Sequence, residues 1–185
     1  MTYYGAKELA ASFQLVRSNT LTIAEEIGEE NYGFRATPET RTVAQTLVHL
    51  AVITRMPLQL HKVEARTSLE GFDFMSFFGA LIGEESAPRT KAEVIALLKE
   101  EGDKFASWLG GLSEEFLAQE VTFPAGMTPP VKTRFEMLMS AKEHEMHHRA
   151  QLMVMERMLG QVPHLTRRMQ EFIAARQAEA AKASA

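Results

Sequence analysis

Three of the six histidines in this chain, His144, His147 and His148, lie within five consecutive residues. A residue in an α-helix advances by about 100°, so His144 and His148 would lie about 40° apart, one turn from each other. Two imidazoles placed in this way can bind one metal ion from a single helix. The pattern therefore predicts metal binding and requires a third ligand from elsewhere in the chain.

The sequence around the two histidines predicts the longest helix of the protein. Thr133-Arg-Phe-Glu136 is a capping box, and the helix is expected to run to about Leu159, with Gly160 just after its end. Its inward-facing stripe is Met137, Ala141, His144, His148, Leu152 (or Gln151), Met155 and Leu159. The histidine pair thus interrupts an apolar stripe in the middle of the helix.

A candidate third ligand lies on another predicted helix. The capping box Thr42-Val-Ala-Gln45 begins a helix that is apolar over most of its circumference, and His49 interrupts this apolar surface. Helix bundles build metal sites from side chains on facing helices. His49, His144 and His148 would give three nitrogen ligands and leave a coordination position open, as in catalytic zinc centres. Imidazole also suits nickel and iron.

The rest of the pattern predicts an all-α four-helix bundle over residues 1–165. Two further helices are expected over residues 6–28 and 91–110, and Pro57 should kink or end the helix that carries His49. Residues 71–83 predict a short helix or an ordered loop over one end of the core, and residues 121–130 an extended segment. Residues 166–185 predict a C-terminal helical extension that buries little and is partly flexible or bound to a partner.

Composition argues against several classes of protein. The net charge is −4 over 185 residues, which gives no sign of a nucleic-acid surface or a polybasic membrane anchor. The absence of cysteine excludes disulfides, thiolate metal sites and a thiol nucleophile. No apolar run approaches the roughly 18 residues that a membrane span needs. We therefore expect a cytoplasmic protein with no nucleic-acid or membrane partner.

The remaining histidines have simpler interpretations. His147 points to a more polar side of its helix and is expected to support the ligands, lie at an interface or be exposed, although a His144/His147 ligand pair is geometrically possible. His61 and His164 are expected at the surface. A lone buried histidine is usually a satisfied core residue, but two side by side must share a proton, pair with acids or bind a cation.

His144-Glu145-Met146-His147-His148 also matches H-E-x-x-H, the signature in which a glutamate activates zinc-bound water in metalloproteases. His164 does not fit the spacing of a downstream third ligand in that class, and Glu156 or Glu171 would have no motif around it. The sequence also lacks a strand to line a protease cleft. A zinc protease is therefore a secondary alternative.

Two segments resemble the DinB/YfiT family: Arg41-Thr-Val-Ala-Gln-Thr-Leu-Val-His49 and Glu143-His144-Glu-Met-His-His148-Arg-Ala-Gln151, followed by Leu159-Gly-Gln-Val-Pro163. The resemblance covers about residues 6–163. It implies a four-helix bundle, often a homodimer, in which His49, His144 and His148 bind a divalent metal, often nickel or zinc.

The resemblance also implies a class of reaction. Relatives include transferases and isomerases that use a low-molecular-weight thiol, so a thiol-dependent S-transferase or a hydrolase acting on a small electrophile is expected. Glu145 is a candidate base, and Arg149 and Gln151 are candidates to orient ligands or bind the cofactor or substrate. A stress-related metal-binding or interaction protein without catalytic activity is the alternative.

Overall fold

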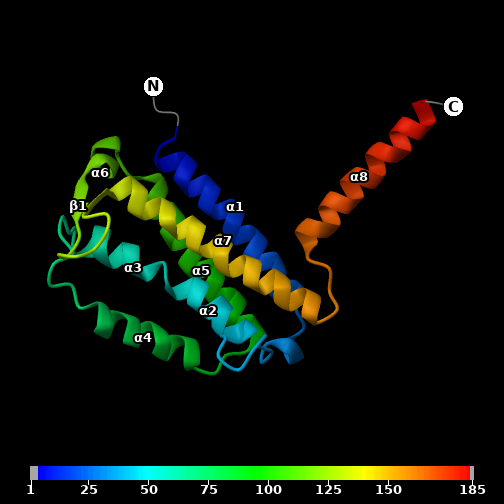
Figure 1. Cartoon of the computed structure of the whole chain (residues 1–185), viewed down its shortest axis with the longest axis horizontal. Coiled ribbons are helices and arrows are strands. Elements are labelled where there is room, and N and C mark those ends of the chain that lie inside the picture. Colours follow the sequence, from blue (N-terminus) through cyan, green and yellow to red (C-terminus); the bar gives the residue numbers. More distant parts are fainter. Residues whose placement is uncertain (1–3, 184–185) are drawn as a thin grey trace.

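Four helices lie side by side and form the bundle in a computed structural model that describes residues 4–183 (Figure 1). They are α1 (Ala6–Glu26), α2 (Val43–Val52), α5 (Lys91–Gly110) and α7 (Arg134–Met158). Helices α1 and α2 each contact both α5 and α7. The predicted all-α four-helix bundle is confirmed.

Capping boxes begin three of the four bundle helices, as the sequence predicts. In each, the threonine side chain accepts a hydrogen bond from the backbone of the third helical residue, whose side chain bonds back to the threonine backbone. The pairs are Thr42 with Gln45, Thr90 with Glu93, and Thr133 with Glu136. Local sequence alone therefore fixes where these helices start.

Shorter elements connect the bundle helices. Pro57 was expected to kink or end the second helix, and α2 in fact ends at Val52. The chain then continues through a single turn and a π-helix toward the opposite end of the bundle (Figure 1). The connecting elements are η1 (Glu29–Asn31), α3 (Arg55–Pro57), the π-helix η2 (Leu58–Val63) and α6 (Glu114–Ala118).

The aromatic segment between Gly71 and Gly83 forms more structure than the sequence indicated. It contributes to α4 (Phe74–Ser86), a helix of 13 residues capped by Asp73. This helix packs against α2 and lies outside the four-helix bundle, rather than over one end of the core (Figure 1). Only two of its residues, Leu81 and Glu85, are buried, so α4 contacts the rest of the protein along a narrow stripe.

The extended segment after α6 forms a small antiparallel hairpin. Strand β1 (Glu120–Thr122) pairs with β2 (Val131–Thr133), with Val121 opposite Lys132. Val121 is buried and packs with Leu60 of η2 and with Leu69. The hairpin therefore anchors the end of the bundle toward which η2 runs.

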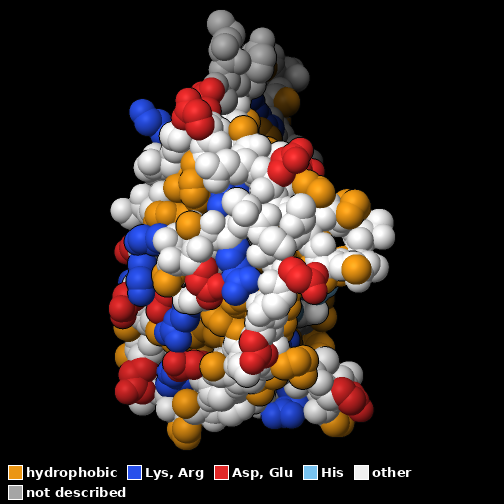
Figure 2. Space-filling model, turned by 90° about the vertical axis from the view of Figure 1, so that its left-hand side faces the viewer, with side chains coloured by type: hydrophobic (Ala, Val, Ile, Leu, Met, Phe, Trp, Pro, Cys, Tyr) orange, Lys and Arg blue, Asp and Glu red, His pale blue; other side chains and the backbone are white. Residues whose placement is uncertain are grey.

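The last helix, α8 (His164–Ala183), projects away from the bundle (Figure 1). Its apolar residues Met169, Phe172 and Ile173 are exposed, in agreement with the expectation that this segment buries little. Whether residues 1–165 and 166–185 behave as separate units stays a prediction. On the face shown in Figure 2, acidic, basic and hydrophobic side chains are mixed. Within residues 4–183, no helix is long and apolar enough to cross a membrane.

Two histidines that were expected at the surface are buried, so that prediction was wrong. His61 is 2% exposed, because the π-helix turns it inward, where its Nδ1 lies 2.7 Å from a guanidinium nitrogen of Arg134. His164 is 3% exposed and its Nε2 lies 3.0 Å from the amide oxygen of Asn19 on α1. Both depend on partners distant in the sequence, which helical periodicity cannot indicate.

A buried carboxyl group on α7 leads to a prediction about stability and pH. Glu156 is fully buried, and neither of its carboxylate oxygens has a hydrogen-bond partner within the described chain. Burial, and then the nearby charge of Glu26, raise the pKa of Glu156 from 4.5 to about 7. The folded protein therefore holds this proton more tightly than the unfolded chain, and the resulting stability is present below pH 4.5 and lost as the pH rises to 7.

We expect the free energy of unfolding of Glu156→Gln at pH 8 to exceed that of the wild type by about 2–3 kcal/mol, so that the variant unfolds at a higher urea concentration. At pH 4.5 we expect little difference. Urea unfolding at the two pH values, followed by circular dichroism, measures this. Glu171→Gln, on the exposed surface of α8, is the matched control and should leave the pH dependence unchanged. An equal pH dependence in Glu156→Gln and wild type would contradict the assignment.

Candidate metal centre

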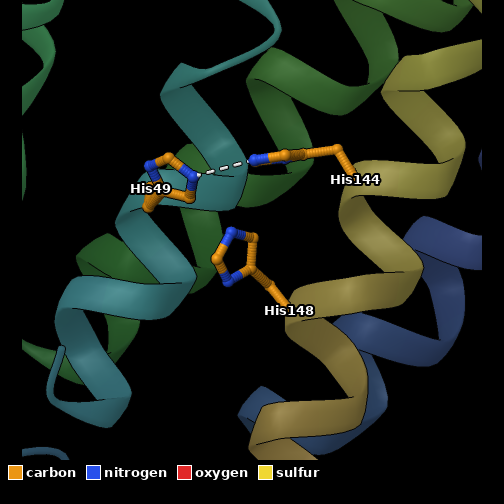
Figure 3. A group of neighbouring side chains, drawn as sticks. All are labelled: His49, His144 and His148. Carbon is orange, nitrogen blue, oxygen red and sulfur yellow. Dashed lines mark hydrogen bonds between the residues drawn. The ribbon is translucent and has the colours of Figure 1, made fainter. Parts of the chain in front are cut away.

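The three histidines predicted as ligands meet between two facing helices. His49 comes from α2, and His144 and His148 from adjacent turns of α7, with all three rings directed into the same space (Figure 3). The candidate ligand atoms of the three all lie within 4.8 Å of one another. His49 and His148 are buried, and His144 is half-buried. Helical spacing thus identified a cluster that the fold assembles.

Glu85 of α4 fixes the orientation of His49. Its carboxylate oxygen lies 2.7 Å from Nδ1 of His49, and the same carboxylate pairs with Arg41 at 2.6 Å. A carboxylate accepts hydrogen bonds, so Nδ1 of His49 carries the hydrogen and Nε2 keeps its lone pair. This carboxylate–histidine arrangement is the usual support of a metal-binding histidine.

Gln151 has a similar effect on His148. Its side-chain oxygen lies 2.7 Å from Nδ1 of His148, one helical turn away. With the amide oxygen as acceptor, Nδ1 donates and Nε2 of His148 is again free to bind a cation. The sequence suggested Gln151 as a ligand-orienting or substrate-binding residue, and the structure places it against His148.

The electrostatics of the cluster favour neutral imidazoles. Burial lowers the pKa of all three histidines, and for His144 burial and the charges of the other two rings lower it to about 4. The charge of Arg41 acts in the same direction on each. All three rings are therefore neutral at pH 7, which is the form that binds metals.

The donor set fits a divalent ion. Nε2 of His49 and Nε2 of His144 are 3.3 Å apart, and two nitrogens bound at about 2.05 Å to a tetrahedral zinc ion would be separated by about 3.3 Å. Nδ1 of His144 is buried and has no hydrogen-bond partner within the described chain. Within residues 4–183 this is also the only group of three or more histidine, aspartate or glutamate side chains close enough to share an ion, and no fourth side chain of these types joins it.

The cluster opens onto a pocket of about 670 Å³. His49 and His144 line one part of it, together with Glu85 and Arg41, and most of the remaining wall is apolar. Helix α4, which lies outside the four-helix bundle, contributes Phe74, Phe78 and Leu81 to this wall. A small molecule in the pocket would therefore reach two of the three candidate ligands directly.

The proposed role of Glu145 as a base needs correction. Glu145 is 2% exposed, and its two carboxylate oxygens bind Nε and Nη2 of Arg17 on α1 at 2.8 and 2.9 Å. It does not line the pocket. On a helix it lies about 80° from the middle of the His144–His148 pair, so when the pair faces α2, Glu145 faces α1. Because the glutamate of a zinc protease must reach zinc-bound water, the structure also argues against the protease alternative.

Two further residues near the motif lie away from the pocket. His147 is exposed, and its Nε2 is 3.3 Å from the side-chain nitrogen of Gln151, so it does not join the three-histidine cluster. Arg149, a candidate for substrate or cofactor binding, is not part of the pocket wall. Its charge instead acts on His164 at the start of α8. The rotation of α7 that turns His148 inward turns Arg149 away from α2.

Glu85, the most direct support of the site, was not among the residues predicted from the sequence. It follows an aromatic, glycine-bounded segment that was not recognised as a full helix, so its distance from His49 could not be anticipated. A signal was present, since Leu81 and Glu85 are four residues apart and share a helix face. Which residue this face would meet was decided only by the packing of α4 on α2.

An all-α bundle with three histidines between two facing helices defines the class of protein. Residues 12–152, most of the chain, match the model of the DinB superfamily, and the chain belongs to this family. The resemblance seen in the sequence is thus confirmed. No curated protein matches the chain.

Solved structures agree with this fold at low sequence identity. A DinB-like protein from Bacillus subtilis is 21% identical, with 84% of this chain and 94% of that one covered and a TM-score of 0.60. YfiT from Bacillus subtilis is 18% identical, with 87% and 91% covered and a TM-score of 0.64. YfiT is described as a probable metal-dependent hydrolase with an unusual four-helix bundle topology.

The geometry predicts which histidines are needed to bind metal. His49→Ala removes the only ligand from α2 and should lose the bound ion, whereas His147→Ala should keep one ion per chain because His147 lies outside the cluster. Purified, metal-loaded variants can be compared by plasma emission spectroscopy, with circular dichroism to verify folding. An unchanged metal content in His49→Ala would show that the ion is bound elsewhere.

The contact between Glu85 and His49 leads to a separate prediction. Glu85→Gln should weaken divalent metal binding about 10- to 100-fold, because a carboxylate partner raises the basicity of a histidine ligand and fixes its tautomer. Competition with a chromophoric chelator measures the affinity. The neighbouring variant Glu84→Gln is the matched control, since Glu84 pairs with Arg55 and Arg89 and does not contact His49. Equal losses of affinity in both variants would contradict a specific role for Glu85.

Proposed function

We propose that this protein is a metal-dependent enzyme that acts on a small electrophilic molecule, either by hydrolysis or by transfer to a low-molecular-weight thiol. The observation that carries the proposal is the position of the three-histidine cluster beside a mainly apolar pocket, which His49 and His144 line, with Glu85 supporting His49. The description of YfiT as a probable metal-dependent hydrolase supports the same class of function.

The chain's own residues would hold the ion through Nε2 of His49, His144 and His148. Glu85 keeps the Nδ1 hydrogen of His49 in place, and Gln151 does the same for His148. When bound, a divalent ion such as zinc or nickel supplies Lewis-acid chemistry, which polarises an electrophile and lowers the pKa of a bound water or thiol. The apolar wall of the pocket binds the body of the substrate and excludes bulk water.

Arg41 gives the same part of the pocket a positive charge. Its guanidinium pairs with Glu85, and the residue lines the pocket beside His49 and His144. A group that develops negative charge during the reaction, such as a carbonyl oxygen under attack, would be stabilised there. Glu85 is the only acidic residue in the described pocket wall, and it is engaged by Arg41 and His49.

A non-catalytic metal-binding protein is the competing function. Structural zinc sites are closed by four protein ligands, whereas catalytic sites keep one position for water or substrate. The described residues offer three ligands and an adjoining pocket, which favours catalysis. The homodimer and the cytoplasmic location expected from the sequence stay predictions.

Activity measurements test the proposal. Metal-free protein, reloaded separately with zinc and nickel, is assayed with 4-nitrophenyl esters and with 1-chloro-2,4-dinitrobenzene in the presence and absence of a thiol cofactor. We expect turnover that requires the metal and falls about 100-fold or more in His49→Ala but not in His147→Ala. Turnover without thiol indicates a hydrolase, and turnover that requires thiol indicates a transferase.

Two results would contradict the catalytic proposal. If no substrate in either series turns over, while the metal raises the melting temperature strongly, the site is structural and the catalytic proposal fails. Turnover that is the same with and without metal would also contradict it.

A further inference from the structure

A second polar position lies in the pocket at a distance from the three histidines. His61 of η2 is part of the pocket wall, although its side chain is 2% exposed. It follows His49 by twelve residues and lies on another element, because α2 ends at Val52 and His61 belongs to the π-helix η2. The pocket wall therefore carries His61 from η2 in addition to His49 and His144 of the candidate metal cluster.

The tautomer of His61 is fixed by its neighbour. Arg134, buried at the start of α7, donates a hydrogen bond from a guanidinium nitrogen to Nδ1 of His61 at 2.7 Å. Because a guanidinium can only donate, Nδ1 must accept, and the neutral ring carries its hydrogen on Nε2. Burial and the charge of Arg134 also lower the pKa of His61 to about 4, so the ring stays neutral at pH 7.

This donor is left without a protein partner. Arg134 is held by Gln119 and by the carbonyl oxygen of Ala65 as well as by His61, but nothing in residues 4–183 accepts a hydrogen bond from Nε2 of His61. Nε2 of His61 is not among the buried atoms that lack a partner, and His61 is part of the pocket wall. A molecule in the pocket can therefore accept this hydrogen bond.

The surroundings of His61 specify the charge of the missing acceptor. Lys132 of β2 also lines the pocket, and it lies opposite the buried Val121 in the hairpin, so both side chains are on the same face. Val121 packs with Leu60, the residue before His61. Lys132 in the pocket wall and Arg134 behind His61 thus add positive charge here. The only acidic residue of the described pocket wall, Glu85, is engaged by His49 and Arg41.

We propose that the pocket selects elongated, mainly apolar molecules that end in a carboxylate, which accepts a hydrogen bond from Nε2 of His61 and pairs with Lys132. The apolar body then lies along the wall formed by residues such as Leu60, Leu69 and Phe78, and the other end of the molecule points to His49 and His144. This assignment of a substrate class rests on the proposed function, and it makes His61 and Lys132 specificity-determining residues.

Binding to the metal-free protein tests the proposal independently of catalysis. Isothermal titration with decanoate and with 1-decanol, which have the same chain length, should show decanoate binding about tenfold more tightly. Lys132→Met and His61→Phe should each remove most of this preference. Lys104→Met, on the exposed surface of α5, is the matched control and should leave it unchanged.

Two outcomes would overturn the proposal: equal binding of decanoate and decanol by the wild type, or a preference that survives Lys132→Met. If His61→Phe does not fold, Lys132→Met and long-range ¹H–¹⁵N spectra of the wild type still decide the matter. The spectra should show hydrogen on Nε2 of His61, and hydrogen on Nδ1 would contradict the assignment. Because no metal or turnover is involved, failure here is distinct from failure of the proposed enzymatic function.

Discussion

One buried guanidinium connects the whole bundle. Arg17 of α1 pairs with Glu145 of α7 through two hydrogen bonds, and it also donates to the backbone oxygens of Leu98 on α5 and Leu50 on α2. A side chain added at Gly102 would come within 2.9 Å of Arg17, so this glycine leaves room for it. Removing either member of such a buried pair would leave an unpaired charge, which costs several kcal/mol.

This ion pair also determines the position of the candidate site. Because Glu145 is held against α1, the rotation of α7 is fixed, and His144 and His148 face α2, where His49 completes the cluster. The glutamate of the H-E-x-x-H pattern therefore stabilises the fold and orients α7, while a different carboxylate, Glu85, supports the ligands. The same five residues that mark a protease elsewhere have another function here, since an active site is defined by geometry and not by the motif alone.

Helix α4, outside the bundle, provides residues that support and surround the candidate metal site. Helix α4 supplies Glu85, which orients His49, and it supplies Phe74, Phe78 and Leu81 to the pocket wall. Elements η2 and β2 contribute His61 and Lys132 to the same pocket wall. The bundle thus provides the three candidate ligands, and the elements around it provide their support and the surface that would select a substrate.

The helix starts, the bundle and the three candidate ligands could be predicted from the sequence. Capping boxes and a 3.6-residue apolar period are local signals, and His49, His144 and His148 interrupt the apolar stripes of their helices. The environments of Glu145, His61 and Glu85 depend on how separate elements pack and could not be predicted from the sequence. Each is a charged or polar residue whose partner is distant in the chain: Arg17, Arg134 and His49, respectively. Periodicity places such a residue on a face of its helix, but the packing of separate elements decides what that face meets.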